Sequence, residues 1–193
     1  MNYEICISGF GGQGILSFGQ IISYSAMIDG KETSWMPSYG PEMRGGTANC
    51  IVIVSDKKIS SPIVSKFDAL FAFNQPSIEK FESKIKKDGL LFYEETTIVK
   101  HPSREDLTII PVNCLEIAIQ IGNKQIQNMV MLGAFLGITN LVSIEAVKES
   151  LKIILPTHKH GLIDLNLNAI EKGKKVISEK NEIINFNWSA YGK

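Results

Sequence analysis

Two hydrophobic patterns alternate along this chain and predict an α/β fold. Short apolar runs rich in β-branched residues, typical of buried strands, are separated by segments whose apolar residues recur every three or four positions, as on one face of a helix. The expected strands are Tyr3–Ser8, Thr33–Met36, Thr47–Ser55, Ala69–Phe73, Gly89–Tyr93 and Leu107–Val112. The expected helices cover about residues 14–27, 74–86, 115–121, 143–153 and 162–179.

Strands that alternate with helices indicate one domain with a largely parallel sheet flanked by helices, a Rossmann-like topology. We place this domain at residues 1–180 and treat residues 181–193, a polar stretch that includes Trp188 and Tyr191, as a C-terminal tail. The Lys57–Val64 segment carries Pro62, which sheet edges tolerate, and it is expected to form an antiparallel edge hairpin.

A second feature of the apolar pattern lies between Asn128 and Leu141, where Gly133 and Gly137 are four residues apart. Small residues at this spacing let a helix pack closely on another backbone. The sequence leaves open whether that backbone belongs to the core or to another subunit.

The first predicted strand and helix are joined by a glycine-rich turn. Glycines accept positive φ and allow close backbone approach, so the turn can present amide groups at the positive end of a helix. It is a candidate cradle for an anion or a phosphate, although a tight turn needs glycine without any ligand, and contact with a neighbouring chain is an equal alternative. Its candidate residues are Gly9, Gly11, Gly12, Gln13 and Gly14.

The same glycines match a dinucleotide-binding fingerprint, which also requires an acidic residue at the end of the second strand. Asp29 has about the right spacing, but it falls in the turn Asp29-Gly30-Lys31, and the second strand runs into Pro37 without a carboxylate. This mismatch disfavours NAD(P) binding.

Residues 37–46 contain two prolines and three glycines and are expected to form a loop. Arg44 offers a planar set of donors for a carboxylate or a phosphate, although a solvated pair with Glu42 is the simpler alternative. Asn49 follows this loop, and Asn74 lies at the carboxyl end of a strand, where α/β sheets bind ligands and partners. The candidates here are Ser38, Tyr39, Gly40, Glu42, Met43, Arg44, Gly45, Gly46, Asn49 and Asn74.

Composition narrows the function further. The 20 basic and 20 acidic residues give no excess charge for nucleic acid or an anionic membrane, and no apolar run is long enough to span a bilayer. The chain enters a strand directly at its N-terminus, so we expect a cytoplasmic protein.

Metal and catalytic motifs are missing from the sequence. The three cysteines have no C-x-x-C spacing and are expected to be buried core thiols, without a cluster or a disulfide. His158 and His160 lack nearby acidic or thiolate partners for a metal, and Glu94-Glu95 is interpreted as a solvated strand end. We therefore expect no catalytic residue and no metal site on this chain.

Two motifs together carry a family resemblance. The turn Gly9–Gly14 and the segment Pro37–Asn49, supported by Ser61-Pro62 and Asp68–Pro76, resemble the gamma subunit of the 2-oxoacid:ferredoxin (acceptor) oxidoreductases over most of residues 3–180. The resemblance implies a catalytic-domain chain of the pyruvate/ketoisovalerate oxidoreductase gamma type. The form of residues 42–49 is closer to the 2-oxoglutarate and branched-chain 2-oxoacid members than to the pyruvate members, and 2-oxoglutarate is the favoured substrate.

The resemblance also implies partners and cofactors. Thiamine diphosphate, Mg and iron–sulfur clusters are expected on alpha, beta and delta-type subunits, coenzyme A is the co-substrate, and ferredoxin or a similar acceptor takes the electrons. This chain would bind none of these cofactors alone, and its two candidate loops would face the partner subunits near the entry of coenzyme A. The alternatives are a stand-alone dinucleotide-dependent oxidoreductase and a non-catalytic interaction module.

Overall fold

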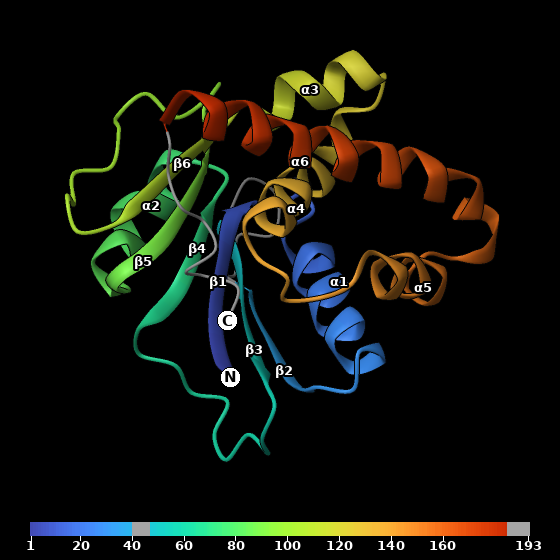
Figure 1. Ribbon diagram of the computed structural model, residues 1–193, viewed down its shortest axis with the longest axis horizontal. Coiled ribbons are helices and arrows are strands. Elements are labelled where there is room, and N and C mark those ends of the chain that lie inside the picture. The colour runs from blue at the N-terminus through green and yellow to red at the C-terminus, as the bar shows by residue number, and fades with distance from the viewer. Residues whose placement is uncertain (40–46, 185–193) are drawn as a thin grey trace.

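Six strands form a single sheet in the computed structural model, which describes residues 1–39 and 47–184 (Figure 1). The strand order is β2-β3-β1-β4-β5-β6. The pairs β1/β4, β4/β5 and β5/β6 are parallel, and β3 lies antiparallel between β1 and β2. The strands are β1 (Asn2–Phe10), β2 (Glu32–Tyr39), β3 (Thr47–Ser55), β4 (Phe67–Ala72), β5 (Ile85–Glu94) and β6 (Thr108–Val112). The predicted α/β domain with a largely parallel sheet is confirmed.

Helices cover the two faces of the sheet unequally. The larger core joins one face of the sheet to residues of five helices, of which α6 packs on α4 and α5 on α1, and a smaller core joins the other face to α2. Alternate residues of β1 therefore enter different cores, Ile5 and Ile7 the larger and Cys6 the smaller. None of the described helices is long and apolar enough to cross a membrane. The helices are α1 (Ile15–Ile28), α2 (Gln75–Phe81), α3 (Cys114–Ile121), α4 (Gln127–Ile138), α5 (Ile144–Ile154) and α6 (Ile163–Ile184), with 3-10 turns at Glu82–Lys84, Lys124–Ile126 and Thr157–Leu162.

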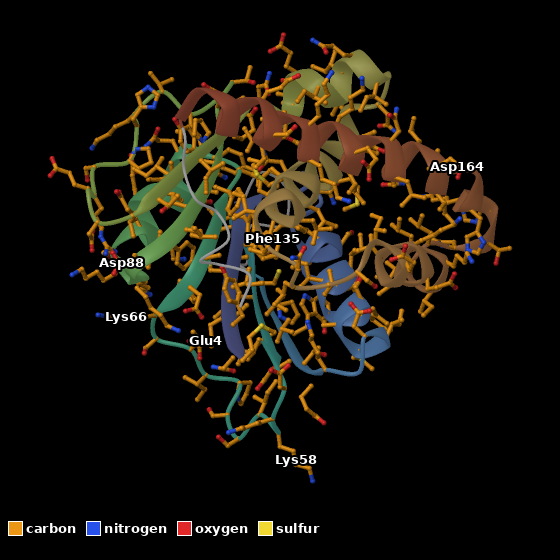
Figure 2. The ribbon with its side chains drawn as sticks, viewed as in Figure 1. Glu4, Lys58, Lys66, Asp88, Phe135 and Asp164 are labelled. Carbon is orange, nitrogen blue, oxygen red and sulfur yellow. The ribbon has the colours of Figure 1, made fainter. Side chains whose placement is uncertain are left out.

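Aromatic rings centre the larger core. Phe135 of α4 is fully buried, and its ring lies 5.2 Å from that of Phe71 and 5.8 Å from that of Phe92. Figure 2 shows Phe135 between helices and sheet, whereas Lys58 and Lys66 lie at the periphery. Such tilted aromatic contacts fix the position of α4 over β4 and β5.

Helix α4 is itself covered by α6, so its small residues pack inside the chain (Figure 1). A Cβ atom on Gly133 would lie 2.0 Å from the backbone oxygen of Ile170. The alternative of core packing, left open by the sequence, is therefore the one observed for Gly133.

The antiparallel edge is present but is made by other residues than expected. The prediction of a hairpin at Lys57–Val64 is wrong, because these residues form no strand. Both sides of β3 are already paired, with β1 and with β2, so a strand that follows β3 cannot form a hairpin with it. The edge strand is β2, which continues through Pro37 to Tyr39, so the prediction of a loop is wrong for residues 37–39, and residues 40–46 lie outside the described residues. Proline is tolerated in an edge strand because it needs no partner for its missing N–H group.

The boundary between α2 and β5 also differs from the prediction of a helix to residue 86. The helix ends in a 3-10 turn at Lys84, and Ile85 already pairs with Phe67 in the sheet. The ladder then shifts register before Ala69 pairs with Leu90, and Asp88 adopts a φ of 61°. Such an irregularity breaks the alternation that sequence patterns rely on.

Glu94 is a further correction, because its side chain is fully buried rather than solvated. Its carboxylate accepts hydrogen bonds of 2.7 Å from both the backbone N–H and the hydroxyl of Thr97, and one of 3.4 Å from the N–H of Leu115. It thus ties the end of β5 to the first turn of α3.

Candidate functional site

The candidate residues that the structure describes gather at the carboxyl edge of the parallel strands. From β1 the chain crosses through α1 to β2 on one side, and from β4 it crosses through α2 to β5 on the other. The connections therefore diverge between β1 and β4, and such switch points are where open α/β sheets bind ligands. The glycine turn follows β1, and Asn74 follows β4.

The predicted glycine turn before α1 is confirmed, and two of its residues need glycine. Gly12 has a φ of 92° and Gly14, the N-cap of α1, has a φ of 76°. No side chain of the described residues caps α1, and no acidic residue lies in its first turn. Gly11 and Gly12 are exposed. The positive end of α1 is therefore not neutralised by a side chain of its own first turn.

Gln13 joins the turn to the neighbouring strand. Its Oε1 accepts a hydrogen bond of 2.6 Å from the Phe10 N–H, and its Nε2 donates one of 3.0 Å to the Phe73 oxygen. A Cβ atom on Gly9 would lie 2.6 Å from the same Oε1 and 2.8 Å from the Cβ of Phe73. Gly9 is thus required by close packing, and the Gln13 amide is engaged within the chain.

Three polar residues form a row across the antiparallel part of the sheet. Ser38 pairs with Asn49, and Asn49 pairs with Ser8, so their side chains point to the same face. The row runs from the exposed Ser38 to the buried Ser8, whose Oγ lies 2.8 Å from the Ser77 hydroxyl. Asn49 of β3 is therefore the middle residue of this row, between Ser38 of β2 and Ser8 of β1.

Asn74 caps α2, as its position before the helix indicates. Its Oδ1 accepts a hydrogen bond of 2.9 Å from the Ser77 N–H and lies 2.6 Å from the Ser77 hydroxyl. Its Nδ2 is buried and has no hydrogen-bond partner among the described residues. The oxygen of Asn74 therefore has a structural role, and the part of the chain that the structure describes offers its nitrogen no acceptor.

The remaining predicted residues are only partly placed. Gly40, Glu42, Met43, Arg44, Gly45 and Gly46 lie outside the described residues. Strand β2 ends at Tyr39, which pairs with Ala48, and Ala48 also pairs with Gly9. The residues that flank positions 40–46 on both sides therefore lie at the same edge of the sheet as the glycine turn.

A groove of about 570 Å³ begins at the turn. Gly12, Gly14 and Ser17 line one end, and the apolar Leu155 and the amide of Asn128 line other parts. Among the described residues that line it, Lys159 is the one charged side chain, so the groove has no carboxylate. Its chemistry suits an anionic ligand with an apolar or amide-containing arm.

Asn128 is the residue of this region that the sequence did not point to. It is the second residue of α4 and is buried, and its Nδ2 donates a hydrogen bond of 3.1 Å to the Gly14 oxygen. A Cβ atom on Gly14 would lie 2.4 Å from that nitrogen. The sequence could have indicated this residue, because Asn128 is a polar residue in the first turn of a helix that is otherwise mostly apolar.

Two further expectations concern metals and thiols. The described residues contain no group of three or more His, Cys, Asp or Glu side chains arranged to hold a metal ion. Cys6, Cys50 and Cys114 are free and buried, with Cys6 in the smaller core and the other two in the larger. Burial raises the pKa of Cys50 to about 12. The described residues therefore do not fit an iron–sulfur cluster.

Asp29 has a structural role that explains its place after α1. Its two carboxylate oxygens accept hydrogen bonds of 2.6 and 2.7 Å from the backbone N–H and the hydroxyl of Ser143, the N-cap of α5. Asp29 therefore connects α1 to α5 and is not at the carboxyl edge of the sheet.

Comparison with known proteins shows the family to which this chain belongs. Residues 4–176 match the family model of pyruvate ferredoxin/flavodoxin oxidoreductase. A ketoisovalerate oxidoreductase subunit VorA of Methanothermobacter marburgensis is 40% identical over 88% of this chain, which spans 35% of that relative. A 2-oxoglutarate synthase subunit KorC of Methanocaldococcus jannaschii is 37% identical, over 93% of this chain and 96% of the relative.

Solved structures agree. The gamma subunit of a keto/oxoacid ferredoxin oxidoreductase from Geobacter sulfurreducens is 31% identical and superposes with a TM-score of 0.78, over 92% of this chain and 99% of that one. A 2-oxoglutarate:ferredoxin oxidoreductase from Magnetococcus marinus, solved with 2-oxoglutarate, coenzyme A and succinyl-CoA, is 27% identical with a TM-score of 0.83, over 92% of this chain and 31% of that one. This chain belongs to the pyruvate ferredoxin/flavodoxin oxidoreductase family, in the part that corresponds to the gamma subunit.

Proposed function

We propose that this chain is the gamma subunit of a 2-oxoacid:ferredoxin oxidoreductase that forms an acyl-coenzyme A thioester and CO2 from a 2-oxoacid. Thiamine diphosphate, Mg and the iron–sulfur clusters belong to alpha, beta and delta-type partner subunits, and ferredoxin or a similar acceptor receives the electrons. Coenzyme A enters as co-substrate. The chain itself supplies a surface for assembly and for the approach of coenzyme A.

One observation supports the proposed surface: three segments converge at the carboxyl edge of the parallel strands. The glycine turn, the ends of the 40–46 segment and the Asn74 cap are brought together by the pairing of β2, β3, β1 and β4. The adjoining groove has Lys159 and no carboxylate among its described lining residues, which suits the phosphates of coenzyme A. The described residues offer no acid/base pair at this edge, so the chemical steps are assigned to the partner chains.

The substrate is inferred separately. We infer 2-oxoglutarate from the form of residues 42–49, and the relatives named above include subunits of both 2-oxoglutarate and ketoisovalerate enzymes. Assay of the purified complex with 2-oxoglutarate, ketoisovalerate and pyruvate, using viologen reduction and added coenzyme A, decides between them. A higher kcat/KM for ketoisovalerate than for 2-oxoglutarate would overturn this part of the proposal.

Assembly is tested by gentle affinity isolation of the chain from its own cells. We expect larger partner chains to be recovered with coenzyme A-dependent activity. Substitution Arg44→Ala in the same complex is expected to weaken assembly or raise the KM for coenzyme A about tenfold, the effect of losing one charged hydrogen bond. Lys58→Ala is the control, because Lys58 is exposed beyond the opposite end of β3. Unchanged assembly and unchanged KM in the Arg44 variant would exclude its assigned role.

A stand-alone dinucleotide-dependent oxidoreductase is the second candidate function. Asp29, which has the spacing of the ribose-binding acid, is bound to Ser143 instead. Titration of the purified chain with NADH tests this candidate, and saturable enhancement of NADH fluorescence would support it over the first.

A further inference from the structure

The glycine turn is held from two sides by side-chain amides. Gln13 binds the Phe10 N–H and the Phe73 oxygen, which fixes the turn against β4. Asn128 of α4 binds the Gly14 oxygen, which fixes the last residue of the turn against the start of another helix. These contacts come from two different elements, since Phe73 follows β4 and Asn128 is the second residue of α4.

The turn needs such contacts because its own sequence does not fix its shape. Gly11 and Gly12 are exposed, and no atom of the described residues lies within 4 Å of a Cβ position on Gly12. Glycine loses more conformational freedom on folding than any other residue, so a turn of this composition samples many conformations unless it is held. Binding by a mobile turn would lose affinity to the ordering of that turn.

The Gly14 carbonyl is a sensitive place for one of these contacts. It also accepts the first hydrogen bond of α1, 2.9 Å from the Phe18 N–H. The hydrogen bond from Asn128 to the same oxygen therefore fixes both the start of α1 and the direction in which the glycine turn enters the helix. Asn128 also lines the groove that starts at the turn.

We propose that Asn128, together with Gln13, is a positioning residue that holds the glycine turn in the conformation that receives coenzyme A. The inference rests on the function proposed above for this turn. Asn128 acts through Gly14 and not on the reacting atoms. The Asn128 donor matters because an acidic side chain of the same shape would place an oxygen against the Gly14 oxygen and lose the hydrogen bond.

The test uses Asn128→Asp in the assembled complex, with Thr139→Val as the matched control. Thr139 is buried at the other end of α4, and its hydroxyl donates a hydrogen bond of 3.1 Å to the Phe135 oxygen. Both substitutions are nearly isosteric and remove one buried donor to a backbone oxygen. Asn128→Asp also adds a carboxylate to the groove, so hydrogen exchange of the turn, and not the KM alone, distinguishes loss of positioning from charge repulsion of coenzyme A. A role in folding alone predicts the same kinetics for both variants.

We expect Asn128→Asp to raise the KM for coenzyme A about tenfold, with the KM for the 2-oxoacid unchanged, since one lost hydrogen bond is worth about a factor of ten. Thr139→Val should leave both KM values as they are. Equal KM values for coenzyme A in the two variants and the unaltered complex would overturn the proposal.

Hydrogen exchange gives a second measurement that does not depend on catalysis or on assembly. In Asn128→Asp, a peptide spanning residues 9–16 should exchange its amide hydrogens about tenfold faster than in the Thr139→Val variant. If the variant fails to assemble, the isolated chain provides this measurement, and equal exchange in the two variants would contradict the inference.

A third variant separates this inference from the function on which it rests. Gly12→Ala has open space but places a side chain at a φ of 92°, so it distorts the turn directly. If Gly12→Ala changes neither assembly nor the KM for coenzyme A, the proposed function of the turn is wrong. If Gly12→Ala raises that KM and Asn128→Asp does not, only the positioning role is wrong.

Discussion

Gly133 of α4 and Gly173 of α6 lie in reciprocal close contact with the opposite helix. A Cβ atom on Gly133 would lie 2.0 Å from the Ile170 oxygen, and one on Gly173 would lie 1.9 Å from the Val130 oxygen. Both obstacles are backbone atoms, which cannot move aside as a flexible side chain would. The two helices can approach this closely only because both positions lack a side chain.

We therefore expect Gly133→Ala and Gly173→Ala each to lower the free energy of unfolding by about 2–4 kcal/mol, the range of severe overpacking. Urea titration followed by circular dichroism measures the loss. Gly161→Ala is the control, because Gly161 is exposed and a Cβ there would meet no atom of the described residues within 4 Å. Equal stability of the Gly133 and Gly161 variants would show that the helices can separate without cost.

The buried carboxylate of Glu94 leads to a second prediction. Replacement by alanine leaves the backbone N–H and hydroxyl of Thr97 without their acceptor, so Glu94→Ala should destabilise the chain by about 1–3 kcal/mol. Thermal unfolding measures this loss. Glu105→Gln, at an exposed loop position, should change stability by less than about 0.5 kcal/mol. A Glu94 variant as stable as the Glu105 variant would mean that Thr97 finds another acceptor.

The contact between Arg104 and Asp106 predicts a dependence of stability on pH. A hydrogen bond from the guanidinium of Arg104, 2.6 Å from Asp106 Oδ2, lowers the pKa of Asp106 below its ordinary value of 3.8. A lowered native pKa stabilises the fold above 3.8, and this contribution is lost as the pH falls through the native pKa. Asp106→Asn should therefore be less stable than the unaltered chain at pH 6, with the difference shrinking below pH 3.8. Urea titrations across this range test the sign, and a difference that grew on acidification would contradict it.

Thiol reactivity provides a fourth prediction. The pKa of Cys50 is raised to about 12 by burial, and burial also raises the pKa of Cys6 and Cys114. At pH 8 only about one Cys50 in ten thousand is a thiolate, and none of the three side chains is exposed. We expect no alkylation of these cysteines by iodoacetamide in the folded chain and labelling of all three in urea, as counted by mass spectrometry. Rapid labelling of Cys50 in the folded chain would show that the larger core opens.

The sequence predicted the elements whose hydrophobic pattern is regular. Thr47–Ser55 was predicted with the bounds that β3 has, and the helix expected at about residues 143–153 is α5, Ile144–Ile154. Lys57–Val64 was misinterpreted because strand propensity is local, whereas the pairing of β3 on both sides is set by residues far away in the chain. Glu94 was misplaced because its burial depends on Thr97 and α3, which strand periodicity does not describe.

In the candidate site, too, the features with a local sequence signature could be predicted, whereas the contacts between distant residues could not. The glycine turn and Asn74 could be found because glycine and cap positions have local signatures. The row Ser38, Asn49 and Ser8 depends on cross-strand register, and the contact of Asn128 with Gly14 joins positions 114 residues apart. Contacts of this kind follow from tertiary packing, so neither was visible in the sequence.

The central place of β1 has a consequence for how the chain folds during synthesis. Its neighbours are β3 and β4, so Ile5 pairs with Val52 and Ala69, which the ribosome makes much later. Until β3 and β4 have been made, the apolar β1 therefore has no lateral partner, and long-range pairing of this type is slow and exposed to aggregation. Chaperones that shield nascent apolar segments should thus contribute more to the yield of this chain than to that of a protein in which the corresponding strand begins a local hairpin.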